Sequence, residues 1–201
     1  EWCEDEEITQ DGMQIYTMSL TRSLLTFYKR LQSVVRTFDP NIIVGSGDSH
    51  IGFLGSTIAG KLSIPFVFDL YHYYPHFRSN RLPGMKWMFH KALDDASCVV
   101  CDSDALKKKI DMPEKKVEVV EQGVDPHTFY PMAETEAKKA LGLSTEAVYI
   151  GYTGGLGPRF DYELLCNALE VLYREDGVKL LLAGRNVRNF DLNKEWLVFL
   201  G

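Results

Sequence analysis

One stretch decides the fold, residues 96–125, which read ASCVVCDSDALKKKIDMPEKKVEVVEQGVD. A short apolar run at 97–101 is followed by a segment of helical composition after Ser103 and then by a second apolar run at 117–120. Apolar runs of this length are typical of strands that are buried in a parallel sheet. Because the connection between them is too long for a hairpin, the stretch predicts a strand, a helix with Ser103 as its N-cap, and a parallel strand.

The same alternation extends in both directions along the chain. Upstream we expect a helix over about 20–38, a strand at 42–44, a helix capped by Ser49, a strand at 65–68 and a helix over about 84–94. Downstream we expect a helix near 135–141, a strand at 148–152, a helix that starts at Asp161 and stops at Gly177, and strands at 179–183 and 198–200. This order predicts the α/β class, with parallel sheets covered by helices on both faces.

The alternation breaks between Gln122 and Pro131, where turn-forming residues stand at both ends of the segment. We therefore predict two Rossmann-like, doubly wound domains, both incomplete in this chain. The first comprises residues 1–122, residues 123–131 form a linker, and residues 132–201 begin the second domain.

Composition excludes several classes of function. The formal net charge of −6 argues against nucleic acid as a partner, because phosphates demand clustered Lys and Arg. No apolar run approaches the length of a membrane-spanning helix. Four cysteines are too few for a disulfide framework in 201 residues, which favours a reducing, cytoplasmic compartment. Cys98 and Cys101 form a C-x-x-C, but they do so on an apolar strand, so we expect neither a metal nor a redox role.

Ligands of open α/β sheets bind beyond the carboxyl ends of the strands, and this rule selects the candidate residues. In the second half, Gly154 and Gly155 would let backbone N–H groups approach a phosphate, next to the positive end of the helix that starts near Asp161. Arg159 would add a phosphate contact, and Gly184 ends the next strand. The alternative is a tight turn that needs glycine for its backbone angles and binds nothing.

The first half offers His72 as a catalytic candidate and four interdomain or cleft candidates. His72 could hydrogen-bond a sugar hydroxyl or polarise a reacting group, or it could simply pack within its aromatic loop. Asp69 stands at a strand end, where it could instead form an Asx turn. The cleft candidates are Gly47, Asp69, Gly123 and Asp125.

Taken in order, segments over about 39–201 resemble the retaining glycosyltransferases of the GT-B fold, particularly family 4. The most specific match is residues 120–125, V-E-Q-G-V-D, with F-Y-P at 129–131. This pair resembles the family's N-G-V-D and F-x-P, with Gln122 in place of Asn. Residues 39–44, 64–69, 101–106, 151–161, 180–184 and 196–201 also resemble segments of the family.

The resemblance implies transfer of a sugar from a nucleotide-diphosphate sugar, held by the second domain, to a saccharide or lipid-linked acceptor held by the first. It implies no cofactor and no obligatory metal, because catalysis rests on positioning and on stabilisation of the leaving diphosphate. His72 corresponds to a family histidine near the transferred sugar, and the Gly154–Gly155 loop would face the diphosphate. Peripheral membrane association and the oligomeric state are left open.

The sequence departs from the family pattern in two ways, and these departures leave two alternative functions open. Gly155 stands where many members have Arg, and Arg159 only approximates a family Lys. The family's paired-glutamate motif would fall beyond Gly201, so we expect residues 1–201 alone to be an inactive fragment that lacks both ends. One alternative is therefore a non-catalytic α/β binding or regulatory module of GT-B-like fold, and another is a GT-B-like epimerase of nucleotide sugars.

Overall fold

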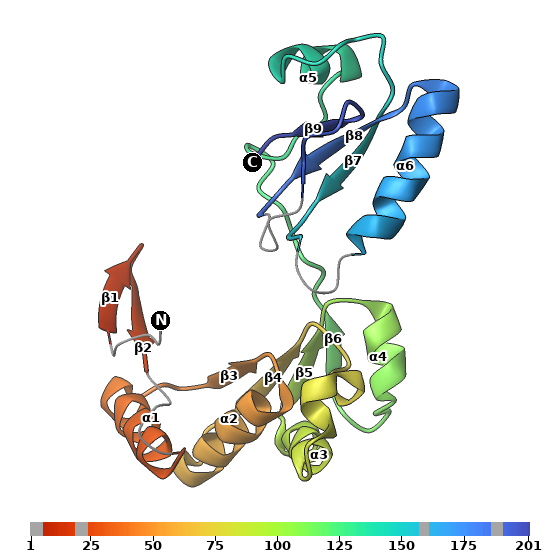
Figure 1. Cartoon of the computed structure of the whole chain (residues 1–201). Helices are drawn as coiled ribbons and strands as arrows, with labels where there is room; N and C mark the ends of the chain where they lie inside the picture. The colour runs from red at the N-terminus through yellow and green to blue at the C-terminus, as the bar shows by residue number, and fades with distance from the viewer. Residues whose placement is uncertain (1–5, 19–23, 157–160, 186–190) are drawn as a thin grey trace. The chain divides into compact units, whose positions relative to one another are not determined.

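The chain forms two compact units, Glu1–Gly123 and Val124–Gly201. The computed structural model describes residues 6–18, 24–156, 161–185 and 191–201 (Figure 1). The contacts between Cα atoms divide the chain one residue after the sequence-based boundary at 122. The roles of the two units, acceptor binding and donor binding, stay predictions.

The first unit contains a hairpin, a four-stranded sheet and the helices between its strands. In chain order its elements are β1 (Glu6–Gln10), β2 (Met13–Thr17), α1 (Leu24–Phe38), β3 (Ile43–Ser46), α2 (Ser49–Leu62), β4 (Phe66–Leu70), the 3-10 turns η1 (Tyr74–His76) and η2 (Arg78–Arg81), α3 (Met85–Asp95), β5 (Cys98–Cys101), α4 (Asp104–Ile110) and β6 (Val117–Val119). The strands and helices expected from 42 to 120 are all present, within one or two residues of their predicted bounds.

The four-stranded sheet has the order β3-β4-β5-β6, and every pair in it is parallel. Parallel pairing confirms the α/β prediction, because each connection returns the chain to the same end of the sheet. The register joins Ser46 to Asp69 and Leu70 to Cys101. The carboxyl ends of the strands therefore meet at one edge.

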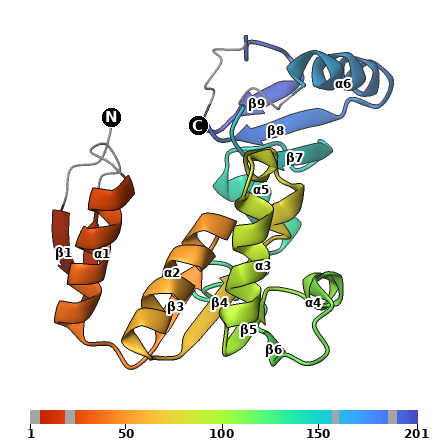
Figure 2. The ribbon, with the colours of Figure 1, turned by 90° about the horizontal axis from the view of Figure 1, so that it is seen from below.

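Three helices of this unit, α2, α3 and α4, pack on one face of the four-stranded sheet. One core cluster joins Ala59 of α2, Phe89 of α3 and Leu106 of α4 to Phe68 and Val99 of the sheet. Figure 2 shows α2 and α3 in front of the strands. Because successive crossovers are right-handed and all advance in the same direction, they place their helices on the same side. The opposite face carries Val44, which is 57% exposed.

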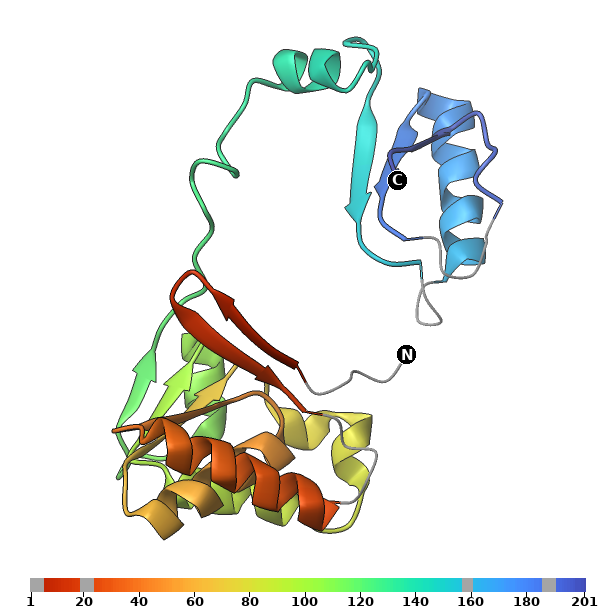
Figure 3. The ribbon, with the colours of Figure 1, turned by 90° about the vertical axis from the view of Figure 1, so that its left-hand side faces the viewer.

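The hairpin β1–β2 was not predicted, since the sequence was expected to alternate helices and strands. Its strands pair antiparallel, with Gln10 opposite Met13 (Figure 3). The two residues between them, Asp11 and Gly12, have φ of 50° and 80°. Positive φ at both positions is the conformation of a type I′ turn, for which Asp-Gly is a preferred pair. That dipeptide was the signal in the sequence.

The N-caps follow the prediction at Ser103 and depart from it at Ser49. Ser103 Oγ accepts a hydrogen bond from the Leu106 N–H at the start of α4. The cap of α2 is Asp48, whose Oδ1 accepts from the Ser49 N–H at 2.6 Å. Ser49 is instead the first helical residue, and its buried hydroxyl donates to Asn80 Oδ1 at 2.5 Å. A tertiary partner thus displaces the predicted local role.

The second unit is a three-stranded parallel sheet of order β7-β8-β9. Its elements are α5 (Glu134–Ala140), β7 (Tyr149–Thr153), α6 (Tyr162–Asp176), β8 (Lys179–Ala183) and β9 (Leu197–Phe199). Gly177 ends α6 with φ of 67°, as predicted, and its N–H donates to the Tyr173 carbonyl. The core of the unit consists of Leu156, Leu169, Leu180, Leu182, Trp196 and Leu197.

Candidate functional site

In the first unit, a polar cluster stands at the carboxyl ends of β3 and β4. The parallel register places Ser46 beside Asp69, and Ser46 Oγ donates to Asp69 Oδ2 at 2.8 Å. The same hydroxyl lies 2.7 Å from the Tyr71 hydroxyl, so the two share a hydrogen bond. The predicted Asp69 thus belongs to a set of one carboxylate and two hydroxyls, which matches the donors and acceptors of a sugar. Sequence reasoning missed Ser46 and Tyr71, although aligning the strand ends would have indicated Ser46.

Gly47 follows directly and packs against the same strand end. Its φ of 119° lies in a region that glycine adopts without a steric penalty, and its N–H donates to the Asp69 carbonyl at 3.1 Å. A Cβ there would meet no atom within 4 Å. Gly47 is therefore required by backbone angle and leaves open space above the loop. The structure brings the predicted Gly47 and Asp69 together.

His72 lies on the loop that follows β4, and its side chain is exposed. Its ring centroid is 5.3 Å from that of Phe77 and 6.1 Å from that of Tyr74. These contacts orient the imidazole without enclosing it. Both of its predicted roles, ligand contact and packing within an aromatic loop, are compatible with this position, and the catalytic role stays a prediction.

Asn80 fixes this loop to the start of α2, and sequence reasoning gave no sign of it. Its side chain is 4% exposed. Its Nδ2 donates to Asp48 Oδ1 at 2.7 Å, while its Oδ1 accepts from the Ser49 hydroxyl. Burial of a fully bonded amide at this point ties residues 71–84 to the N-terminus of α2. The loop that carries His72 is thus held at one end by the strand β4 and near its other end by Asn80.

Carboxylates gather around this site. Burial raises the pKa of the Tyr74 hydroxyl, and the negative charges of Asp48, Asp69 and Asp102 raise it further. Asp102 itself follows β5 and accepts a hydrogen bond from the Ser103 hydroxyl at 2.9 Å. The edge formed by the strand ends is therefore an acidic, hydroxyl-rich surface, suited to polyol ligands more than to anions.

Gly123 and Asp125, the remaining cleft candidates, fall in different units. Gly123 is exposed, with no atom within 4 Å of a Cβ placed on it. Asp125 caps a turn, since its Oδ2 accepts from the Thr128 hydroxyl at 2.7 Å and its Oδ1 from the His127 N–H at 2.9 Å. These bonds lower the pKa of Asp125, with the Thr128 hydroxyl as the larger cause. This local role explains an Asp at this position, and a role in a cleft stays a prediction.

In the second unit, the glycines of two neighbouring strand ends meet. A Cβ on Gly184 would lie 2.2 Å from the Gly154 carbonyl oxygen, so this approach is open only to glycine. The Gly154 N–H donates to the Ala183 carbonyl, and the Leu156 N–H to the Arg185 carbonyl, both at 2.9 Å. Leu156 is fully buried and anchors the loop in the core.

Gly155 lies between these two anchored residues and differs from both. It is exposed, and a Cβ on it would meet no atom within 4 Å. Within the described residues, its N–H donates to no backbone carbonyl. The loop therefore presents one backbone donor at the carboxyl end of β7, where phosphate groups bind in open α/β sheets. Arg159, the other predicted phosphate contact, lies outside the described residues.

The C-x-x-C stands on β5, as predicted. Residues three apart in a strand point to opposite faces, and accordingly Cys101 is buried whereas Cys98 is partly exposed. Burial raises the pKa of the Cys101 thiol to about 11. Across the described part of the chain, no three side chains of His, Cys, Asp or Glu are grouped as a metal site would require.

Both the sequence and the fold of this chain resemble those of known proteins. The sequence profile of Glycosyltransferase Family 4 matches residues 7–128, more than half of the chain. The chain belongs to this family. A comparison of this family-4 chain with curated proteins gave no significant match.

Solved structures share the fold of the family-4 chain. HepE of Anabaena, in complex with UDP, has a TM-score of 0.59 at 17% identity, over 80% of this chain and 43% of HepE. A glycosyltransferase from Rickettsia africae has a TM-score of 0.55 at 18% identity, and the match covers 87% of this chain and 48% of the other. UDP-GlcNAc 2-epimerase of Neisseria meningitidis, bound to UDP-GlcNAc, has a TM-score of 0.56 at 13% identity, and the match covers 91% of this chain and 56% of the epimerase. The α/β fold of GT-B type is thereby confirmed, and the chain spans about half the length of these proteins.

None of the helices in the described ranges is long and apolar enough to span a bilayer.

Proposed function

We propose that this family-4 chain is part of an enzyme that transfers a sugar from a nucleotide-diphosphate sugar to a hydroxyl of a saccharide or lipid-linked acceptor. The observation that carries the proposal is the Gly154–Gly155 loop. Gly154 is held against Gly184, and among the described residues the Gly155 N–H at the strand end donates to no backbone carbonyl. A backbone donor at an uncrowded glycine suits a diphosphate, which must approach the main chain closely.

The first unit would hold the acceptor. In the cluster of Ser46, Asp69 and Tyr71, the carboxylate and the phenol hydroxyl each lie within 2.8 Å of the Ser46 hydroxyl, which is a hydrogen-bonding set for sugar hydroxyls. We place His72 at the same edge, where its exposed ring can contact the transferred sugar. Family membership, carried by residues 7–128, supports this assignment.

A UDP-sugar is the donor class to test first, because HepE was solved in complex with UDP. The second candidate function is epimerisation of a nucleotide sugar, favoured by the likeness to the Neisseria meningitidis epimerase. The third candidate, a binding module without catalysis, is favoured by Gly155 in place of the family's Arg. The transferase and the epimerase both require nucleotide binding by the second unit, and the binding module does not.

The test is calorimetric titration of the full chain with UDP and GDP. We compare the wild type with Gly155→Ala and with Gly151→Ala, a matched control, since a Cβ meets no atom within 4 Å at either position. Ala keeps the backbone N–H, but its Cβ would occupy the space through which a phosphate approaches that N–H and so prevent the hydrogen bond. Loss of one hydrogen bond to a charged phosphate weakens binding by about 10- to 100-fold. We expect this loss for Gly155→Ala alone, with unchanged unfolding midpoints for both variants. Equal affinity of the two variants would exclude the loop as the phosphate site, and no binding to wild type would favour the binding module.

We further propose that donor binding needs no metal ion, as the family resemblance implies. The same titration in the presence of EDTA should give the same affinity for UDP. A fall in affinity that Mg²⁺ or Mn²⁺ restores would reject this part of the proposal.

A further inference from the structure

The charge of the chain is distributed unevenly around the loop after β4 and the helix α3. Residues 70–93 contain four basic side chains and no Asp or Glu, in a chain whose net charge is −6. All 28 acidic residues therefore lie elsewhere. A basic segment of this kind within an acidic protein calls for an explanation by its partner rather than by solubility.

Large apolar side chains are exposed between these basic residues. Leu82 is 67% exposed, Trp87 58% and Phe77 41%. They alternate in sequence with cations that are also exposed. We call this set the basic-apolar patch, and it consists of Phe77, Arg78, Arg81, Leu82, Lys86 and Trp87.

The backbone beneath the patch is held in place. The turn η2 contains the buried Asn80, which bonds to Asp48 and Ser49 of the α2 N-terminus. The Trp87 ring stands 5.2 Å from the ring of Phe53 on α2. The apolar side chains are therefore presented outward from an ordered surface, and their exposure is not explained by a poorly packed loop.

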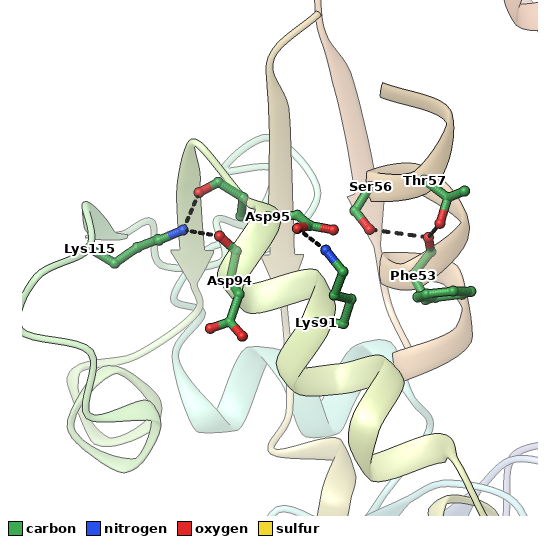
Figure 4. A network of polar contacts seen from close by, with 8 residues as sticks. Phe53, Ser56, Thr57, Lys91, Asp94, Asp95 and Lys115 are labelled. Atoms are coloured by element: carbon green, nitrogen blue, oxygen red, sulfur yellow. Dashed lines mark hydrogen bonds and ion pairs between the residues drawn. The ribbon is translucent and has the colours of Figure 1, made fainter. Parts of the chain in front are cut away.

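The cations of the patch are available to a partner. Across the described residues, no carboxylate forms an ion pair with Arg78, Arg81 or Lys86. Lys91, further along α3, is by contrast turned toward Asp95, with which it pairs (Figure 4). Asp94 lies about 12 Å along the helix from Lys86, at a rise of 1.5 Å per residue. The acidic end of α3 is thus separate from its basic start.

We propose that the basic-apolar patch docks this protein on a bilayer that contains anionic lipid. Arg and Lys are attracted to the negative headgroups, while Trp, Phe and Leu enter the boundary between headgroups and acyl chains. Charge complementarity favours this occupant, because the patch is a region without acidic residues in an acidic protein and combines its cations with exposed apolar side chains. The exposed Leu82 and Trp87 favour a lipid surface over nucleic acid, which offers no apolar phase.

Docking there would bring the candidate acceptor site to the membrane. Phe77 of the patch contacts the ring of His72, so the patch borders the carboxyl ends of the strands directly. This proximity favours a lipid-linked acceptor over a free saccharide, an inference that rests on the proposed function. The docking itself requires no catalytic activity.

The experiment is co-sedimentation of the full chain with vesicles of phosphatidylcholine, with and without phosphatidylglycerol. The triple variant R78Q/R81Q/K86Q removes the cations of the patch. The matched control, K107Q/K108Q/K139Q, removes the same charge from exposed lysines of α4 and α5. Each cation near an anionic surface is worth about fivefold in partitioning, so the patch variant should lose about 100-fold and the control little. Leu82→Gln should also weaken vesicle binding, and this loss should depend less on the salt concentration than the loss caused by R78Q/R81Q/K86Q.

Each other outcome overturns the proposal. Equal losses for the two triple variants would show a non-specific charge effect, and equal binding to neutral vesicles would remove the electrostatic basis. Tighter binding to single- or double-stranded oligonucleotides than to anionic vesicles would assign the patch to nucleic acid. Matching unfolding midpoints establish that both triple variants fold. Vesicle binding is measured without nucleotide, so its failure leaves the UDP titration unaffected, and the reverse holds as well.

Discussion

Gly52 provides the most direct test of how the first unit is packed, through the variant Gly52→Ala. The residue lies in α2, where the helix crosses the sheet and α3. An ideal Cβ at Gly52 would stand 2.4 Å from Phe68 Cζ and 3.0 Å from Ala92 Cβ. Favourable carbon contacts are about 3.5–4.0 Å, so either the helix or the ring must move by about 1 Å.

Phe68 cannot move cheaply. It is fully buried, and its ring centroid is 6.0 Å from those of Phe66 and Phe89. Overpacking of such a site costs about 1–3 kcal/mol, whereas Ala gains about 1 kcal/mol over Gly in a helix. With contacts on two sides, we expect a net destabilisation of about 1–2 kcal/mol.

The control is Gly60→Ala in the same helix. No atom lies within 4 Å of a Cβ at Gly60, so only the gain in helix propensity applies. We expect stabilisation by about 0.5–1 kcal/mol. The two Gly→Ala changes are chemically identical, so packing is what distinguishes them. We expect them to change the free energy of unfolding in opposite directions.

The assay is urea unfolding read by hydrogen exchange of the peptide around β4, because two compact units need not unfold together. A change of about 2 kcal/mol moves the midpoint by about 1 M at typical urea m-values. Stabilisation by both variants, or equal destabilisation, would refute the close packing of α2 on Phe68.

Three further predictions concern other sites. Gly184→Ala should destabilise the second unit and release the Gly154 loop, because its Cβ would overlap the Gly154 carbonyl; an unchanged exchange rate in β7 and β8 would contradict this. Cys101 should resist alkylation at pH 8 in the folded chain, since a pKa of about 11 instead of 9.0 leaves about a hundredfold less thiolate. The reactivity of the thiol should rise only as the pH approaches 11. Peptide mass spectrometry measures the extent of alkylation, and rapid labelling of Cys101 at pH 8 would be the opposing result. Asn80→Ala should cost about 1–3 kcal/mol and speed hydrogen exchange in residues 71–84, because it removes the hydrogen bonds that Asn80 makes to Asp48 and to the Ser49 hydroxyl. Amides in residues 71–84 that stay protected in the variant would contradict the role of Asn80 in holding this loop.

The sequence sufficed for the strands of the two parallel sheets, because each one is a short apolar run ended by a polar residue or a cap. Ser103 caps α4 and Gly177 ends α6 as predicted, since both act through neighbours within a few residues. The hairpin carried an equally local signal in Asp11-Gly12, which an expectation of uninterrupted helix–strand alternation overrode.

The errors and omissions share a different cause, which is distance along the chain. Ser49 is not the cap of α2, because Asp48 caps the helix and the Ser49 hydroxyl bonds to Asn80, 31 residues away. The polar cluster at Asp69 was missed in part because Tyr71 folds back to Ser46, 25 residues earlier. Propensity and periodicity describe neighbours in sequence, and these bonds depend on the register between strands and on the course of a loop.

The two units differ in how they present their candidate sites, and this difference bears on the division of roles. At the strand ends of the first unit, side chains supply the polarity, with Ser46 and Tyr71 around Asp69. At those of the second, Gly154 and Gly184 pack closely against each other, and the exposed Gly155 beside them carries no side chain over its backbone. Carboxylates repel a diphosphate but accept hydrogen bonds from sugar hydroxyls, and backbone N–H groups do the reverse. We infer from this chemistry that the second unit is the one suited to the donor diphosphate and the first to a hydroxyl-bearing acceptor.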